Sequence, residues 1–180
     1  MKTGIYTTAI LICAFLLSTK SLTAQQTQQI STTDRFIAYS LYNFSKLIDW
    51  PTSASAKTFQ IAVVGDKRVY AELIDLANNK KIGNATYKIV YCKNIDEISG
   101  YNQIVYLSNM HSGKVGELVR KSESGVLFVT EREGMTKHGS TICFVVNDKG
   151  MLGFEIARDN AVKSKLSIRS QLERMASSVI

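Results

Sequence analysis

Apolar residues recur at helical spacing in the segment that begins near Asp34. The members of this stripe are Ile37, Leu41, Phe44 and Ile48. Steps of three and four positions place them on one face of an α-helix. Pro51 disfavours helical backbone at Trp50, so the helix is predicted to end near Asp49. The only tryptophan and the only proline of the chain therefore mark a helix end, where Trp50 is a large apolar anchor.

Strand-like apolar runs follow, and turn residues separate them. They cover residues 59–64, 87–91, 103–107 and 126–129. Amphipathic helical patterns over residues 69–77 and 113–121 lie between some of these runs. Strands that alternate with helices are typical of βαβ units, which build a mainly parallel sheet.

The pattern changes toward the C-terminus. The runs TICFVV and MLGFEI are joined by Asn147-Asp148-Lys149-Gly150, which is typical of an antiparallel hairpin. Residues 167–177 show helical spacing again and predict a closing helix. The predicted fold class is α/β: a single Rossmann-like three-layer sandwich. Its sheet is mixed and mainly parallel, with a late antiparallel hairpin and helices at both chain ends.

The N-terminal residues have the pattern of an export signal. Lys2 precedes an apolar run, residues 5–17, of signal-peptide length and too short for a comfortable membrane span. We interpret residues 1–24 as a signal peptide, residues 25–33 as a flexible polar spacer and residues 34–180 as the α/β domain. This predicts an exported protein whose mature chain does not span a membrane. An uncleaved N-terminal anchor is the alternative.

Charge and cysteine content narrow the function class. The chain has a formal net charge of +7, but its basic residues are scattered in pairs rather than gathered in one stripe. That distribution, together with export, disfavours nucleic acid as a partner. Cys92 and Cys143 remain after signal cleavage, each in a strand-like run. A disulfide between them and two buried free thiols both agree with an oxidising compartment.

Candidate ligand-binding residues follow the predicted parallel strands. Gly65 and Asp66 end the first strand, and Ser108 and Asn109 end the third. Ligands of α/β sheets bind in the crevice at the carboxyl ends of the strands. These residues therefore define a candidate small-molecule site, although the same residue types also serve as turn formers.

Residues typical of enzymes are sparse. The glycine-rich signatures of dinucleotide and phosphate-binding loops are absent from the sequence, and its two histidines, His111 and His138, lack metal-ligand spacing. Ser108 precedes His111 by three positions without a nucleophile-elbow pattern. Cys143 is predicted to be buried and inert. We expect no enzyme activity, no cofactor and no metal, with a hydrolase as a minor alternative.

Tyr39 and Tyr42 lie off the apolar stripe of the first helix. With Trp50 they form either the cover of a sheet edge or an exposed aromatic surface. Aromatic residues are enriched where proteins bind other proteins. The sequence leaves both interpretations open.

Three segments together resemble the YfiR-like family of exported bacterial proteins. They are AYSLYNFSKLIDWP (38–51), FQIAVVGD (59–66) and GFEIARDNAVKSKLSIRSQLERMA (153–176). Asn102-Gln103 stands where the family often has cysteine, Ala157 where asparagine is common, and Arg169 where serine is common. The family's disulfide pattern is therefore not transferred to this chain.

The resemblance implies a non-enzymatic periplasmic regulator. Such proteins bind the periplasmic part of an inner-membrane sensor, a diguanylate cyclase or a sensor kinase, and hold it inactive. The candidate contact residues are Tyr39, Tyr42, Lys46, Trp50, Arg169 and Arg174. A homodimer is left open. The alternative function is an envelope small-molecule binding protein that uses the crevice residues.

Overall fold

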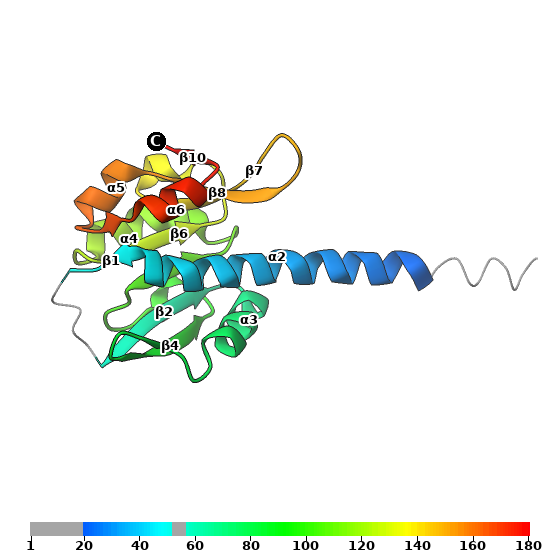
Figure 1. The fold of residues 1–180 in the computed structure, drawn as a ribbon, viewed down its shortest axis with the longest axis horizontal. Helices are drawn as coiled ribbons and strands as arrows, with labels where there is room; N and C mark the ends of the chain where they lie inside the picture. The colour runs from blue at the N-terminus through cyan, green and yellow to red at the C-terminus, as the bar shows by residue number, and fades with distance from the viewer. Residues whose placement is uncertain (1–19, 52–56) are drawn as a thin grey trace, which may run out of the picture.

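The computed structural model describes residues 20–51 and 57–180, with side chains from Thr32 onward (Figure 1). Residues 1–19 of the predicted signal peptide and residues 52–56 lie outside the described part. The helices are α2 (Lys20–Leu47), α3 (Lys67–Ala77), α4 (Val115–Lys121), α5 (Arg158–Lys163) and α6 (Ser170–Met175), with 3-10 turns η2 (Ile95–Glu97), η3 (Ser112–Lys114) and η4 (Met135–His138). The strands are β1 (Ile48–Asp49), β2 (Thr58–Val64), β3 (Lys81–Ile82), β4 (Ala85–Cys92), β5 (Ile104–Leu107), β6 (Leu127–Thr130), β7 (Ile142–Val146), β8 (Leu152–Ile156), β9 (Ser167–Ile168) and β10 (Ser178–Val179).

Eight of these strands form one mixed sheet in the order β10-β8-β7-β6-β5-β2-β4-β3. Strands β4, β2, β5, β6 and β7 are parallel neighbours. Strand β8 returns antiparallel to β7, as the hairpin pattern predicts. The observed architecture confirms the predicted Rossmann-like α/β class.

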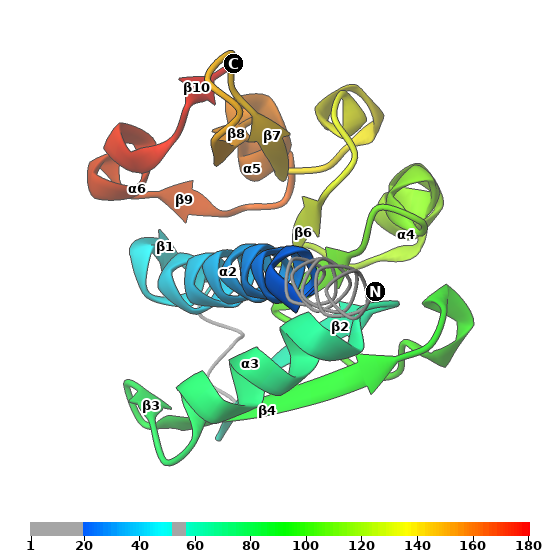
Figure 2. The same ribbon diagram turned by 90° about the vertical axis from the view of Figure 1, so that its right-hand side faces the viewer.

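Helix α2 packs along one face of this sheet. Figure 2 shows α2 end-on, with α3 on the same side of the sheet and α4 on the opposite side. The predicted apolar stripe is buried, and its residues join one core cluster with side chains of β2, β5, β6, β7 and β8. The ring of Phe44 lies edge-on to Phe154, with centroids 5.0 Å apart, and tilted against Phe144 at 6.3 Å. Burial of this stripe is therefore what fixes α2 on the sheet.

Residues along β5 alternate between the two faces. Ile104 and Tyr106 belong to the core cluster beneath α2, whereas Val105 and Leu107 belong to the cluster on the α4 side. Because both faces of the sheet are covered, every side chain of a central parallel strand is buried, and its sequence is a continuous apolar run. The same explanation applies to β2 and β6, whose runs the sequence also predicts as strands.

The two chain ends differ from the predictions. Within the described residues, helix α2 runs from Lys20 rather than from near Asp34, and it includes the segment 25–33. That segment contains neither glycine nor proline, so nothing in it breaks a helix. The single closing helix predicted over 167–177 is wrong: β9, α6 and β10 occupy this region. The reason is tertiary, because β9 pairs with β1 and β10 pairs with β8.

The packing of α2 predicts unequal effects of two substitutions on the same helix. Phe44→Ala removes a ring that is 1% exposed, whereas Tyr39→Ala trims a side chain that is 55% exposed. We expect Phe44→Ala to lower the free energy of unfolding by about 3–5 kcal/mol and Tyr39→Ala to change it by less than about 0.5 kcal/mol. Urea unfolding of the exported chain measures both, and similar losses for the two variants would contradict the packing.

Candidate functional site

Trp50 closes the end of α2 by internal contacts. Its indole Nε1 donates a hydrogen bond of 3.0 Å to the carbonyl oxygen of Ser45. Its ring lies edge-on to Phe59, with centroids 5.0 Å apart. The side chain is half-buried, so one part locks the helix end and another part remains accessible.

The C-terminal region of the chain also contacts the end of α2. Strand β1 pairs antiparallel with β9, which sets Ile48 opposite Ile168. The Arg169 guanidinium donates two hydrogen bonds, of 2.6 and 3.0 Å, to Asp49 Oδ1. The Arg169 backbone N–H also donates to the carbonyl oxygen of Leu47, a group that a helix end leaves without an internal partner. Arg169 therefore lies at the Trp50 corner, and its charge is partly committed to Asp49.

The outward side of α2 carries an aromatic and basic stripe. Tyr39, Tyr42 and Lys46 follow each other at steps of three and four, so they share one side of the helix. Tyr39 is exposed, and Tyr42 is half-buried against Tyr87. Two ammonium groups approach the Tyr42 ring, with Lys46 Nζ at 4.4 Å and Lys80 Nζ at 4.9 Å from its centroid. Positive charge therefore gathers around an accessible aromatic ring.

Arg174 adds a further exposed cation from α6, and it forms no ion pair with any residue the structure describes. Figure 2 shows α2 between β9 and α6 on one side and α3 on the other. We use the name helix-end face for Tyr39, Tyr42, Lys46, Trp50, Arg169 and Arg174. Two segments that lie far apart in the sequence supply it.

The second candidate region is the crevice at the carboxyl ends of β2 and β5. These strands are neighbours in the sheet, and the chain leaves them toward opposite sides, since β4 adjoins β2 and β6 adjoins β5. This is the switch point at which α/β folds bind ligands. Gly65 and Ser108 meet there: a Cβ built on Gly65 would lie 2.6 Å from Ser108 Oγ and 2.3 Å from His111 Nδ1. The sequence-predicted residues thus converge in space.

Their polar groups, however, have internal partners. The Asp66 carboxylate caps α3 by accepting hydrogen bonds of 2.9 and 3.2 Å from the N–H groups of Arg68 and Val69. The Asn109 N–H donates to Glu131 Oε2 at 2.7 Å. Ser108 Oγ lies 3.1 Å from His111 Nδ1. A ligand role for these residues therefore stays a prediction.

The structure adds a pair of ionisable groups that the sequence analysis missed, the buried Tyr106 and the half-buried Glu131. The hydroxyl of Tyr106 donates a hydrogen bond of 2.5 Å to Glu131 Oε1. Burial raises the pKa of Glu131, against the lowering effect of the hydrogen bonds from Tyr106 and Asn109. Burial, followed by the Glu131 charge, raises the pKa of Tyr106. A tyrosine inside the apolar run QIVYL was the one visible signal of a polar contact there.

Asp34 of α2 is a further buried carboxylate next to α3. Burial raises its pKa, and the Arg68 guanidinium, with Nε 3.3 Å from Asp34 Oδ2, opposes that rise. The exposed pair of Arg35 and Glu72 links the same two helices. These ion pairs fix the approach of α2 to α3 rather than build a reaction centre.

Within the described part of the chain, the side chains of a hydrolase triad are not found together. His111 contacts Ser108, yet no described carboxylate hydrogen-bonds to its ring. His138 lies exposed in η4. The Cys143 thiol is buried and donates to the carbonyl oxygen of Arg132 at 2.9 Å. Among the described residues, no group of His, Cys, Asp and Glu side chains has the arrangement of a metal site.

Cys92 and Cys143, the cysteines within the described residues, are free and buried, and the structure has no disulfide between them. Cys92 ends β4 and Cys143 lies in β7, with β2, β5 and β6 between these strands. Neighbouring strands lie about 4.8 Å apart, whereas a disulfide requires Cα atoms within about 7 Å. Burial raises the pKa of both thiols.

The close contacts around Gly65 predict that adding one methyl group there strongly lowers the thermal stability. Gly65 has φ of +79° and no room for a Cβ, whereas Gly83 has φ of +55° and no atom within 4 Å of the Cβ position. Both alanine variants strain the backbone, but only Gly65→Ala also displaces His111. We expect Gly65→Ala to lower the thermal midpoint several degrees further than Gly83→Ala, and the double variant Gly65→Ala/His111→Ala to recover part of that loss. Equal shifts for the two single variants would contradict the geometry.

The half-buried Glu131 predicts a pH-dependent contribution to stability. Its folded-state pKa is raised, so the folded protein holds this proton more tightly than the unfolded chain. The associated stability is present below the ordinary glutamate pKa and is lost as the pH rises through the raised value. Urea unfolding across this range should show wild type losing stability relative to Glu131→Gln. The exposed neighbour Glu133→Gln serves as control, and parallel pH curves for wild type and Glu131→Gln would contradict the assignment.

Comparison with protein-family models identifies a family for this chain. The family model described as YfiR/HmsC-like matches residues 35–177, from within α2 to just beyond α6. A comparison with curated proteins finds no match. In the described residues, no helix is both long and apolar enough to cross a membrane. The family match covers both segments of the helix-end face.

Proposed function

The chain belongs to the YfiR/HmsC-like family, and on this premise we propose that it is a non-enzymatic periplasmic regulator of a membrane-bound signalling protein. Its partner is an inner-membrane sensor of the diguanylate cyclase or sensor kinase type. The single observation that carries this proposal is the family match across most of the α/β domain. The proposed location rests on that family and on the signal-peptide pattern of residues 1–24.

Regulation by such a protein needs no reacting group. A regulator that binds the inactive state of its partner more tightly than the active state shifts the population toward the inactive state. The free energy of the equilibrium between the two states shifts by the difference between the two binding free energies. Each tenfold preference in affinity therefore contributes about 1.4 kcal/mol. A rigid contact surface that distinguishes the two states of the partner is sufficient.

We assign this contact to the helix-end face. Aromatic residues and arginine are enriched at protein interfaces. This face presents Tyr39 and Tyr42 with Lys46 on α2, and an exposed Arg174 on α6. The β1–β9 pairing and the Asp49–Arg169 ion pair hold its two segments together. A surface that is ordered before binding loses less entropy on association. The charges favour an acidic patch on the partner.

A second candidate function is small-molecule binding in the envelope. The convergence of Gly65 and Ser108 at the sheet's switch point is the observation that favours it. Ligand entry there would have to displace the His111 ring from Gly65. Screening of metabolites by thermal shift, with Asp66→Asn and Asn109→Ala as site variants, tests this alternative.

In-cell photo-crosslinking tests the proposed contact. A photoreactive amino acid at position 39 is compared with the same group at position 110, since Met110 is 85% exposed and lies in the loop after β5. We expect position 39 to yield one dominant adduct, identified by mass spectrometry as an inner-membrane protein with a periplasmic sensor domain. Tyr39→Asp should weaken binding of that domain about tenfold or more, while Met110→Asp leaves the affinity unchanged.

Three outcomes would contradict the proposal. Adducts at position 110 but not at position 39 would overturn the assigned face. Recovery of the chain alone, while a known envelope complex is captured in parallel, would overturn the regulatory role. Identification of a soluble enzyme as the dominant adduct would overturn the partner class.

A further inference from the structure

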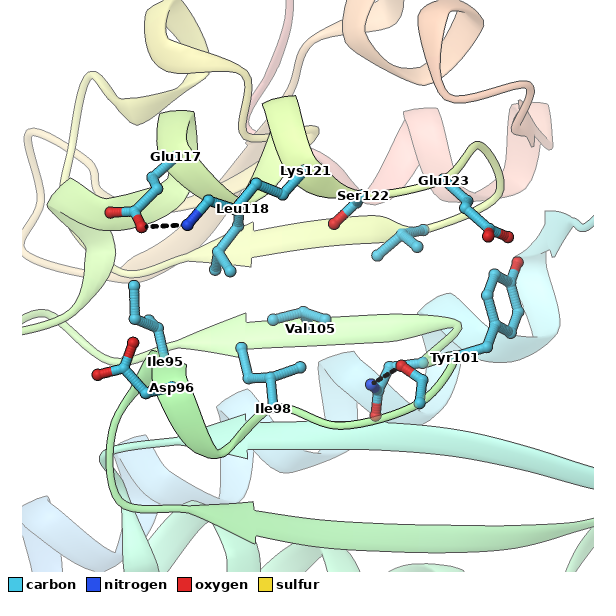
Figure 3. A pocket seen from close by; sticks show the side chains of 13 residues that line it. Ile95, Asp96, Ile98, Tyr101, Val105, Glu117, Leu118, Lys121, Ser122 and Glu123 are labelled. Carbon is cyan, nitrogen blue, oxygen red and sulfur yellow. Dashed lines mark hydrogen bonds and ion pairs between the residues drawn. The ribbon is translucent and has the colours of Figure 1, made fainter.

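The sheet face opposite α2 is only partly covered. The crossover from β4 to β5 contains the short turn η2, where α/β folds usually place a helix. Helix α4 covers the neighbouring part of this face (Figure 2). Between η2 and α4 lies a cavity of about 570 Å³, which we name the α4 groove (Figure 3). The α4 groove therefore exists because the β4–β5 crossover contains a short turn in place of a helix.

Apolar side chains cluster inside the α4 groove, although polar residues also line it. Val105 of β5 and Val126 form its floor, Ile95 and Ile98 come from the η2 side, and Leu118 comes from α4. Figure 3 shows Leu118 and Ile98 pointing toward one another across the opening above and below Val105. A volume of this size lies within the range of small-molecule sites, which are mostly apolar with a few polar groups.

The rim of the groove is acidic although the whole chain is basic. The chain has 22 lysine and arginine residues against 15 acidic ones. Around the groove, the charged residues are Asp96, Glu117, Glu123 and Lys121. Lys121 Nζ lies 2.8 Å from Glu117 Oε1, so these two charges neutralise one another. Asp96 and Glu123 form no ion pair with any described residue, and the rim is left with net negative charge.

One end of the groove combines a carboxylate with an aromatic ring. Figure 3 shows the Glu123 carboxylate beside the hydroxyl of Tyr101. That hydroxyl donates a hydrogen bond of 2.9 Å to the carbonyl oxygen of Gly125, which fixes the ring. Burial and then the Glu123 charge raise the pKa of Tyr101, in agreement with this closeness. A carboxylate beside a tyrosine hydroxyl offers two oxygen acceptors to the N–H donors of an organic ammonium group.

We propose that the α4 groove binds a small organic cation with an aromatic or branched apolar body. The body packs on Val105, Ile98 and Leu118, and the ammonium group lies between Glu123 and Tyr101. The groove lies on the opposite side of the sheet from α2, so this site does not depend on the regulatory function proposed above.

A pair of charge-reversed probes tests the proposal on the exported chain. The cation is 2-(2-naphthyl)ethylammonium, and the anion is 3-(2-naphthyl)propionate, which has the same ring and a similar length. Calorimetry gives the affinities, and methyl NMR locates each probe. We expect the cation to bind at least about fivefold more tightly than the anion and to shift the methyl signals of Leu118, Ile98 and Val105.

Matched variants separate this site from general binding. Glu123→Gln should weaken cation binding about threefold to fivefold, because it removes the unpaired charge at the ammonium end. Glu133→Gln, an exposed carboxylate elsewhere, should leave the affinity unchanged. Ser122→Phe places a ring in the groove and should abolish binding of the cation without loss of the folded circular dichroism spectrum.

Other outcomes would overturn the proposal. Equal affinity for both probes, with no effect of Glu123→Gln, would mean that charge does not select the ligand. Methyl shifts outside the α4 groove, or no binding of the cation at millimolar concentration, would exclude the site. A dimer of the exported chain that Ser122→Phe dissociates would show that a second copy occupies the groove instead.

Discussion

The burial of one apolar stripe on α2 determines how the rest of the molecule is arranged. Phe44 and its neighbours fill the sheet face beneath α2, so the first helix of the domain is part of the core. Its end must then be held against the sheet, and both Trp50 and the β1–β9 pairing do this. Arg169 contributes an ion pair to Asp49, a residue 120 positions away in the chain. The helix-end face is a consequence of this closure.

The sheet separates two surfaces of opposite character. The α2 side presents Tyr42 with two lysines around its ring, whereas the α4 groove has an apolar floor and an acidic rim. A protein partner on the first surface and a small cation in the second would not compete for space. The central strands contribute to both sides, since Tyr106 and Val105 are adjacent residues that point to opposite faces.

Hydrophobic spacing and turn residues were enough to predict the elements that form from local sequence. The stripe from Ile37 to Ile48, the buried strands and the β7–β8 hairpin follow from spacing and turn residues. The β9–α6–β10 ending did not follow, because its strands exist only through pairing with β1 and β8. The convergence of Gly65 with Ser108 was predictable from the switch-point rule, but the His111 ring over Gly65 was not. The α4 groove depends on a missing crossover helix and on side chains from separate segments, which periodicity does not show.

Hydroxyl-radical footprinting of the exported chain, alone and with the periplasmic domain of its crosslinked partner, tests the central claim most directly. This method measures how fast accessible methionine and tyrosine side chains are oxidised. The exposed ones include Tyr39, Met175, Met110 and Met151. The account predicts that the partner protects Tyr39 and Met175, while Met110 and Met151 keep their reactivity. Protection of Met110 with Tyr39 unchanged, or no protection at any of these side chains, would contradict it.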